Sequence, residues 1–417
     1  MKSSSATVLP FPSGPARPEP GWRSFLQTRL PGVVAGAADL DPAAVLTATV
    51  AGATFGLSIA CVVLVCFPVL RSVFHVSARI GHESRKGLVE LAREHYGRTA
   101  GFLLAFGIVA VNMTMIVGDL VVVSDAWGIV MDQPRLFFLA PMAFLVWYLL
   151  LLGHVDRTTK WMGALAFILA AYLLAAWVAT PSVTSLAKGI LLPRMHATGD
   201  YALGVIAVFG SLLTPDVIVW QTSSRRDAPR NVVKSLHHES HAGTFVACMI
   251  SICAIIAASH MTGVKPDELT TRSAAQALSP LGIAGPTLFA IGILGSGLVA
   301  LPLLVASLCF SVAEAFDWSS GLSKKPWDAR HFFVMISVCL FIATFIGLFN
   351  VDTVKVLYWS QVLAGFMVVP ILGLLILLGR NPFLVQNRNT RSENIWLGIA
   401  VGTMILANVA FLISLAF

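Results

Sequence analysis

Two short stretches place proline beside aspartate inside long apolar segments. The first, "DLDPAAVL", contains Asp39, Asp41 and Pro42, and the second, "LLTPDVIV", contains the triplet at 214–216. Proline in a helix interior removes a backbone hydrogen bond and clashes with the preceding turn, so each stretch predicts a broken helix. Neither break offers a thiol, a thioether or an imidazole. Carboxylates, hydroxyls and freed carbonyls are hard oxygen ligands, which suit Mg²⁺ and Mn²⁺.

Oxygen-bearing side chains around the two breaks are the predicted ligands of this cation. A carboxylate at the centre of a membrane helix costs roughly 2.5–3.5 kcal/mol, and these segments hold almost no Lys or Arg to offset it. A dication would turn the mutual repulsion of converging carboxylates into attraction. The predicted metal ligands are Asp41, Ser211, Thr214 and Asp216. The acids predicted to serve a permeation or proton path are Asp119, Asp39 and Asp125.

Each candidate has a purely structural alternative. Asp41 and Asp216 could cap the helices that follow the two prolines. Ser211 and Thr214 could bond back to the preceding helical turn, as hydroxyls often do in membrane helices. Asp125 could lie toward one end of its segment. Capping by one carboxylate oxygen and ligation by the other can coexist.

The elements that would hold these residues are membrane-spanning helices. The chain has 417 residues, of which 57% are hydrophobic and 12% charged, and its mean hydropathy is +0.81. This composition predicts an all-α polytopic membrane protein. About eleven apolar stretches are long enough to cross a bilayer: 32–53, 55–77, 100–130, 135–153, 160–181, 200–222, 241–260, 282–312, 331–349, 354–379 and 394–416.

Basic residues divide unevenly between the two alternating sets of connecting loops. Of the 28 Lys and Arg, 22 fall in the set that includes the amino-terminal tail. The positive-inside rule therefore predicts a cytoplasmic amino terminus, and the odd number of spans predicts an extracytoplasmic carboxyl terminus. The net charge of +7 reflects this topology, and we expect no nucleic-acid partner. Residues 1–30 are expected to form a disordered cytoplasmic tail.

The two predicted breaks lie five spans apart. Matching interruptions in two halves are typical of inverted-repeat transporters, which bind substrate at the midplane. We therefore expect one transporter domain over 31–417, with repeats at about 32–181 and 200–379 and an additional helix at about 394–416. This is a LeuT-like 5+5 arrangement.

Other patterns indicate packing rather than chemistry. The six cysteines all lie in apolar segments without a Cys-x-x-Cys pair, which favours small buried hydrophobes over a metal site. The histidines of "LHHESH" fall in a basic loop and are expected to be solvated. We expect no resident cofactor, no enzymatic activity and a monomer.

At these residues the chain resembles the Nramp (natural resistance-associated macrophage protein) family of divalent metal transporters. The family pattern Asp-Pro-Gly-Asn corresponds to Asp41–Ala44, and Met-Pro-His corresponds to the triplet at 214–216. "SARIGHESRKGLVELAREHYG" resembles the loop after the second family helix, "MTMIVGDLVVVSD" the third helix and "LYWSQV" the tenth. The resemblance implies that Gln361 approaches the metal.

Departures from the family pattern bear on the ion that is carried. The resemblance puts Ala44 where the family has a metal-binding asparagine, Thr214 where it has methionine and Asp216 where it has histidine. A second acid of the third helix corresponds to Val122. These losses resemble the Nramp-related magnesium transporter branch, whose members carry Mg²⁺ and Mn²⁺ without evident proton coupling.

The sequence thus predicts a transporter that imports Mg²⁺ and Mn²⁺ across a bacterial-type inner membrane by alternating access. A proton-coupled Mn²⁺/Fe²⁺ importer is the alternative within this class. A Na⁺-coupled organic-solute symporter of the same architecture is the alternative from another class. The density of fixed aspartates argues against the symporter, because an anionic substrate would meet Asp41 and Asp216 directly.

Overall fold

The computed structural model describes most of the apolar part of the chain. The described residues are 40–152, 170–178, 186, 189, 198–226, 233–261, 285–322, 324–349 and 352–416. Every regular element in these ranges is a helix, and eight helical stretches there are long and apolar enough to cross a membrane. The all-α membrane fold is confirmed, whereas the number of eleven spans remains a prediction.

The helices of the first half carry the first predicted break. They are α2 (Pro42–Phe55), the 3₁₀ helix η1 (Gly56–Ile59), α3 (Ala60–Ser84), α4 (Leu88–Tyr96), α5 (Arg98–Met131), α6 (Leu136–Leu152) and α8 (Ala170–Val178). The helices of the second half follow after residue 198. They are α10 (Gly199–Leu212), α11 (Pro215–Arg225), α12 (Val233–Ala258), the 3₁₀ helix η4 (Ser259–Met261), α14 (Gly285–Phe316), α15 (Arg330–Gly347), α16 (Thr353–Arg380) and α17 (Arg391–Ala416).

Helix α3 differs from its predicted span, 55–77, at both ends. It begins at Ala60 and continues to Ser84 through a polar end, and the stretch expected to be a loop is largely helical, since α4 follows after residues 85–87. An apolarity criterion stops where the side chains become polar, whereas the backbone pattern continues. Arg85 adopts a left-handed conformation and ends the helix, donating its N–H to the carbonyl of Gly81.

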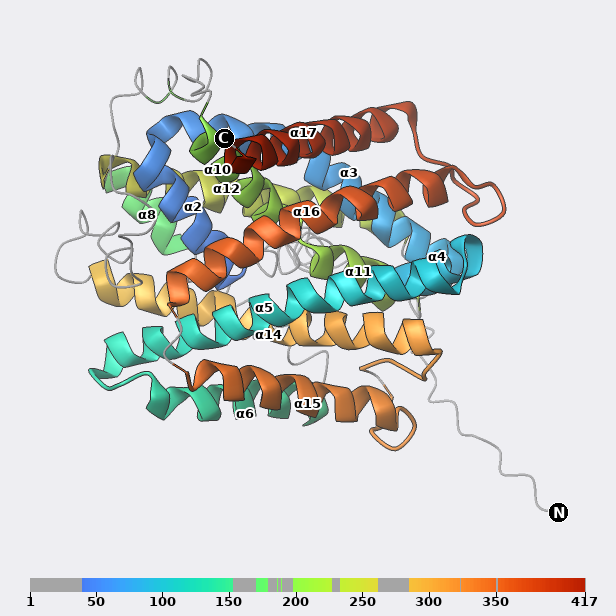
Figure 1. Cartoon of the computed structure of the whole chain (residues 1–417), viewed down its shortest axis with the longest axis horizontal. Coiled ribbons are helices and arrows are strands. Elements are labelled where there is room, and N and C mark those ends of the chain that lie inside the picture. The colour runs from blue at the N-terminus through green and yellow to red at the C-terminus, as the bar shows by residue number, and fades with distance from the viewer. Residues whose placement is uncertain are drawn as a thin grey trace, which may run out of the picture.

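The bundle packs around the long pair α5 and α14, which lie side by side along much of their length (Figure 1). Helices α6 and α15 form a layer against one side of this pair, and α16 and α2 contact it on another side, with α10 packed against α16 and α2. Helix α17 covers α10, α3 and α16. The two halves of the chain are therefore interleaved in one bundle.

Apolar side chains also cover parts of the outer surface. Phe106 of α5, Phe341 of α15 and Leu406 of α17 are each more than two-thirds exposed. Large exposed apolar residues on membrane-length helices are the expected lipid-facing surface. Polar residues that are buried in such a bundle therefore require another explanation.

Candidate metal-binding site

Helix α2 starts at the first predicted break. Asp41 has an extended backbone, Pro42 occupies the first helical position, and the Asp41 carboxylate accepts a hydrogen bond from the N–H of Ala44. This is the expected chemistry of an aspartate N-cap followed by proline. The structural alternative for Asp41 is thus realised at one oxygen, Oδ1, which leaves the second oxygen for another partner. Ala44 contributes its N–H to the cap and a buried methyl group.

The second predicted break separates α10 from α11. Helix α10 ends at Leu212, Leu213 and Thr214 are not helical, and Pro215 is the first residue of α11. Thr214 has an extended backbone like Asp41, but its hydroxyl makes no capping hydrogen bond. Asp216 lies in the first turn of α11, where the helix dipole favours negative charge.

The side chains at this break are buried and differ in how well they are satisfied. Ser211 donates to the carbonyl of Val208 at 2.9 Å, so its structural alternative is realised. The Thr214 hydroxyl and Asp216 Oδ1 have no hydrogen bond of good geometry. Asp216 also accepts a bond from the Ser307 hydroxyl of α14, but at its main-chain oxygen, at 2.8 Å.

Two further helices bring polar groups to the breaks. Asp119 of α5 and Gln361 of α16 are fully buried, and neither carboxylate oxygen of Asp119 nor either amide atom of Gln361 has a hydrogen bond of good geometry. Gln361 approaches the Asp41 carboxylate, and Asp119 approaches the main chain at Ala43. Buried polar groups are normally paired, so this concentration of unsatisfied oxygens indicates a binding site for an ion, water or another ligand.

The three carboxylates also interact electrostatically. Asp41 and Asp216 lie near each other, and Asp119 lies near both, so their negative charges would repel one another. Two unit charges about 4 Å apart interact by roughly 4 kcal/mol at an effective dielectric constant of 20. A divalent cation among them would reverse the sign of this energy.

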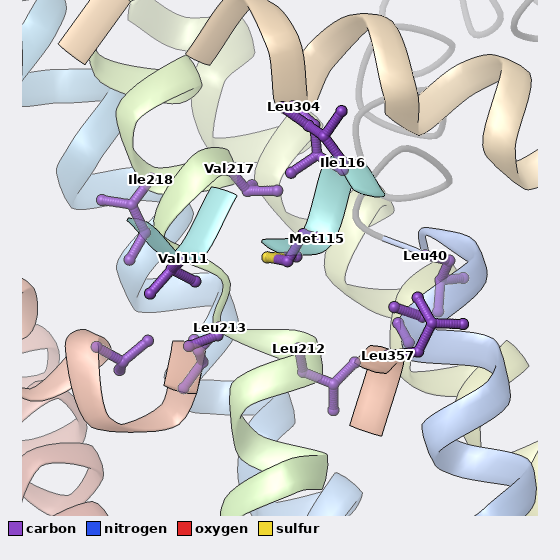
Figure 2. Packing of buried hydrophobic residues seen from close by; sticks show 14 of the residues in the cluster. Leu40, Val111, Met115, Ile116, Leu212, Leu213, Val217, Ile218, Leu304 and Leu357 are labelled. Carbon is purple, nitrogen blue, oxygen red and sulfur yellow. The ribbon is translucent and has the colours of Figure 1, made fainter. Parts of the chain in front are cut away.

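Apolar side chains surround these breaks. Leu212 and Leu213, at the end of α10, and Met115 of α5 converge there with Leu357 of α16 and Leu40 (Figure 2). All five are at most 1% exposed. An apolar shell lowers the local dielectric constant and so strengthens every interaction between the carboxylates and an ion.

The remaining predicted residues do not join this group. Asp125 accepts a hydrogen bond from the Thr353 hydroxyl at 2.8 Å, and its other oxygen lies 3.8 Å from Arg135. It is six residues beyond Asp119, about 9 Å along α5, and the prediction that it serves the ion path gains no support from this pairing. Asp39 lies outside the described residues.

The composition of the site is mixed. Within the described ranges, no three His, Cys, Asp or Glu side chains come close enough to form a metal site by themselves. The coordination shell of any ion at the breaks must therefore be completed by hydroxyl, amide or main-chain oxygens, or by water. Such a ligand set is typical of Mg²⁺, which keeps several waters.

Sequence reasoning missed Asn112. This residue of α5 is fully buried, and neither atom of its amide has a hydrogen bond of good geometry. It lies seven residues before Asp119, hence on the same face of α5 and about 10 Å away along the axis. A neutral amide inside an apolar run carries no charge signal, so only its burial without a partner reveals it.

Comparisons with known proteins place the fold and the chain in one family. Residues 32–414 match the family described as natural resistance-associated macrophage protein-like, or Nramp. The divalent metal cation transporter MntH of Aeromonas hydrophila is 26% identical over 93% of this chain and 94% of its own length. Metal transporter Nramp6.1 of Populus trichocarpa is 26% identical over 68% of this chain, and the match spans only 55% of that longer relative.

Solved structures support the same fold. A variant of the Eremococcus coleocola manganese transporter superposes with a TM-score of 0.73 at 15% identity, over 94% of this chain and 87% of that one. MhsT in complex with L-phenylalanine superposes with a TM-score of 0.60 at 12% identity, over 92% of this chain and 98% of that one. The expected LeuT-like class of fold is therefore confirmed. Since the family match extends over nearly all of the sequence, this chain belongs to the Nramp family.

Proposed function

We propose that the protein imports divalent metal ions, Mg²⁺ and Mn²⁺, by alternating access. The carrying observation is the set of buried, incompletely satisfied oxygens at the two helix breaks. Asp41, Asp216 and Gln361 are expected to bind the ion directly, together with Thr214 and main-chain oxygens. The relatives named above are described as metal transporters, which supports the same class of substrate.

Two features support Mg²⁺ and Mn²⁺ over softer metals. The ligand set contains carboxylate, amide and hydroxyl oxygens, and Thr214 stands where the wider family supplies a thioether. Hard oxygen donors favour Mg²⁺ and Mn²⁺, whereas sulfur donors favour softer ions. Ser211, whose hydroxyl is already bonded to the main chain, is expected to act through water or to shape the break, and the methyl of Ala44 leaves room for water on the ion.

Transport without obligatory proton coupling is the second part of the proposal. Val122 stands where the family has a second acid of the third helix, and an aspartate replaces the histidine of the sixth. Asp119 is then an electrostatic partner of the ion, Asp125 is at most a remote contributor to its path, and Asp39 remains a predicted one. A proton-coupled Mn²⁺/Fe²⁺ importer is the competing proposal.

The membrane placement follows from the distribution of basic residues. We propose a monomer in the plasma membrane, or inner membrane, with the amino terminus in the cytoplasm and the carboxyl terminus outside. The end of the bundle that holds α4, the end of α11 and the start of α17 is then cytoplasmic. These three elements lie toward the same end (Figure 1).

Flux into proteoliposomes tests the function. Purified protein should carry Mn²⁺ inward, and Mg²⁺ in excess should inhibit this flux by competing for one site. Mn²⁺ flux that is insensitive to a large Mg²⁺ excess would contradict Mg²⁺ as a substrate. A pH dye inside the vesicles should report no change during Mn²⁺ entry, since acidification that requires the metal is the signature of the proton-coupled alternative.

A further inference from the structure

A buried carboxylate remote from the breaks holds three helices together. Glu314, near the end of α14, is 4% exposed. Its Oε2 accepts a hydrogen bond from the main-chain N–H of Val89 at 3.0 Å, and its Oε1 accepts one from the hydroxyl of Ser223 at 2.5 Å. Val89 is in the first turn of α4 and Ser223 is near the end of α11. The two carboxylate oxygens of Glu314 therefore bind α4 and α11, one helix each.

The backbone around Glu314 is packed without spare room. A Cβ atom at Gly87, just before α4, would overlap the Glu314 carboxylate, and one at Gly81 of α3 would overlap the main chain of Thr222 in α11. Gly81 lets α3 and α11 approach each other this closely, and Gly87 leaves room for the Glu314 side chain of α14 at the start of α4. The contact between these helices is thus built into the backbone as well as into one side chain.

Arginines complete the arrangement. Arg226, at the end of α11, lies near Glu314 and donates to the carbonyl of Ser320 at 2.9 Å. Arg85, which ends α3, donates to the carbonyl of Arg226 at 2.9 Å. We call Arg85, Ser223, Arg226 and Glu314, with the N–H of Val89, the α11 clamp.

The α11 clamp grips the same helix that carries Asp216. Ser223 follows Asp216 by seven residues, so the clamp lies about 10 Å further along α11 than the carboxylate at its start. The other end of α11 is the non-helical break at Leu213 and Thr214. A short helix that is fixed at one end and hinged at the other can move only when the fixed end is released.

We propose that Glu314 is a positioning residue that holds α11 closed across the cytoplasmic exit of the ion path. In this arrangement the carboxylate acts on the ion only through α11. Release of the clamp lets α11 turn about the break and opens the path from Asp216 to the cytoplasm. The transport consequence rests on the proposed function, whereas the mechanical one does not.

Hydrogen–deuterium exchange of the full-length protein in lipid nanodiscs tests the mechanical part without any metal. Glu314→Ala should accelerate exchange in peptides that cover 88–96 and 217–226 by about tenfold, since the two lost hydrogen bonds together contribute about that factor at ordinary strength. The matched control is Glu393→Gln, which alters another buried carboxylate at the same end of the bundle. It should accelerate exchange only around residues 75–83 and 389–397.

Two outcomes would overturn the α11 clamp. One is unchanged exchange in 217–226, and the other is an equal acceleration in every helix, which would mean general destabilisation. Ser223→Ala provides a milder variant that removes one donor and leaves the Val89 bond in place. It should accelerate exchange in 217–226 less than Glu314→Ala, and the double variant should resemble Glu314→Ala alone.

Flux measurements then test the role in transport. A protein that favours the conformation open to the cytoplasm spends less time with its site open to the outside. Its apparent affinity for external metal therefore falls in proportion. Glu314→Ala should raise the KM for external Mn²⁺ severalfold, while Glu393→Gln should leave this KM unchanged. An unchanged KM in Glu314→Ala, despite faster exchange, would overturn the transport role. Absence of Mn²⁺ flux in the wild type would contradict the proposed function instead, and the exchange result would still decide the clamp.

Discussion

Asp41 and Thr214 occupy the same local position in two different helices. Each is buried, has an extended backbone and directly precedes a proline that starts a helix, Pro42 in α2 and Pro215 in α11. The two differ in their side chains, because the Asp41 carboxylate caps its helix and the Thr214 hydroxyl does not. The breaks are therefore alike in backbone and different in chemistry, which suggests distinct experiments at each.

Asp41→Asn should abolish transport while the protein stays folded. Asparagine caps a helix as well as aspartate does, so the N–H of Ala44 keeps its acceptor and only the charge is lost. An interaction of about 4 kcal/mol with the ion corresponds to a loss of several hundredfold. Mn²⁺ uptake into proteoliposomes and thermal unfolding in detergent would measure the two effects.

The matched control for this change is Asp352→Asn. Asp352 is also an aspartate N-cap, on α16, but it is largely exposed and accepts from the N–H of Lys355 at 3.3 Å. Its substitution should leave uptake unchanged. Normal uptake by Asp41→Asn would exclude a direct role of that carboxylate.

Thr214→Met should shift the ion preference away from Mg²⁺. The new thioether would lie at the break, where a soft donor favours Mn²⁺ and softer ions over Mg²⁺. We expect the excess of Mg²⁺ needed to halve Mn²⁺ uptake to rise by about tenfold, a difference of about 1.4 kcal/mol. Thr244→Met is the control, since Thr244 is a fully buried threonine of α12 whose hydroxyl also lacks a hydrogen bond of good geometry. Equal shifts in both variants would argue against Thr214 as part of the site.

Asn112→Leu should stabilise the protein and impair transport. Replacing a buried, unsatisfied amide by an apolar group of similar size removes a penalty of about 1–3 kcal/mol. If the amide binds water that accompanies the ion, uptake should fall severalfold while the unfolding temperature rises. Asn408→Leu in α17, where the amide oxygen is likewise buried without a bond, should affect stability alone. A variant at Asn112 with unchanged uptake would leave that residue no part in the ion path.

Arg79→Met should weaken the attachment of α17. Arg79 donates to Glu393 at 3.2 and 3.3 Å and to Asn389 at 2.6 Å, and it is 5% exposed. Glu393 would keep its contact with His75 at 2.6 Å and the N–H of Thr390 at 2.7 Å, so the loss is that of the hydrogen bonds from Arg79 to a charged group, about 1.5–3 kcal/mol each. The unfolding temperature should fall, while Mn²⁺ uptake per folded molecule stays the same.

Glu83→Gln is the control for Arg79→Met. Glu83 lies on the same helix and contacts the same loop, where it accepts hydrogen bonds from Asn387, but those bonds are exposed. Surface changes of this kind are usually within about 0.5 kcal/mol. An equal loss of stability in the two variants would contradict the importance of the buried pair.

The breaks could be predicted because proline lies beside aspartate inside an apolar segment. Prolines also lie inside α3, α6, α14 and α16, at positions 68, 141, 302 and 370, without ending those helices. The residues before them are Phe67, Ala140, Leu301 and Val369, none of which can cap a helix through its side chain. At the two breaks aspartate or threonine precedes proline. The pair of residues carried the information that proline alone did not.

Other features of the molecule could not be predicted from the residues next to them in the sequence. Glu314 lies beyond the end of its predicted span, and its partners Val89 and Ser223 are 225 and 91 residues away in sequence. Hydrogen bonds over such separations depend on the packing of whole helices, which periodicity cannot specify. The same holds for Asn112, whose lack of partners is a property of its surroundings and not of its neighbours in the chain.

One close approach fixes α10, the helix before α11, against α16. A Cβ atom at Gly210 would overlap the main chain at Gln361, so α10 and α16 pack backbone to backbone and are expected to move together. Leu213 and Thr214, which follow α10, are then the hinge about which α11 rotates. The distance along the helix from Thr214 to Ser223 is about 13 Å. A rotation of α11 by about 10° therefore displaces Ser223 by about 2 Å, more than a hydrogen bond can stretch. A rotation too small to disturb the predicted ligands next to the hinge is thus enough to break the hydrogen bond between Ser223 and Glu314.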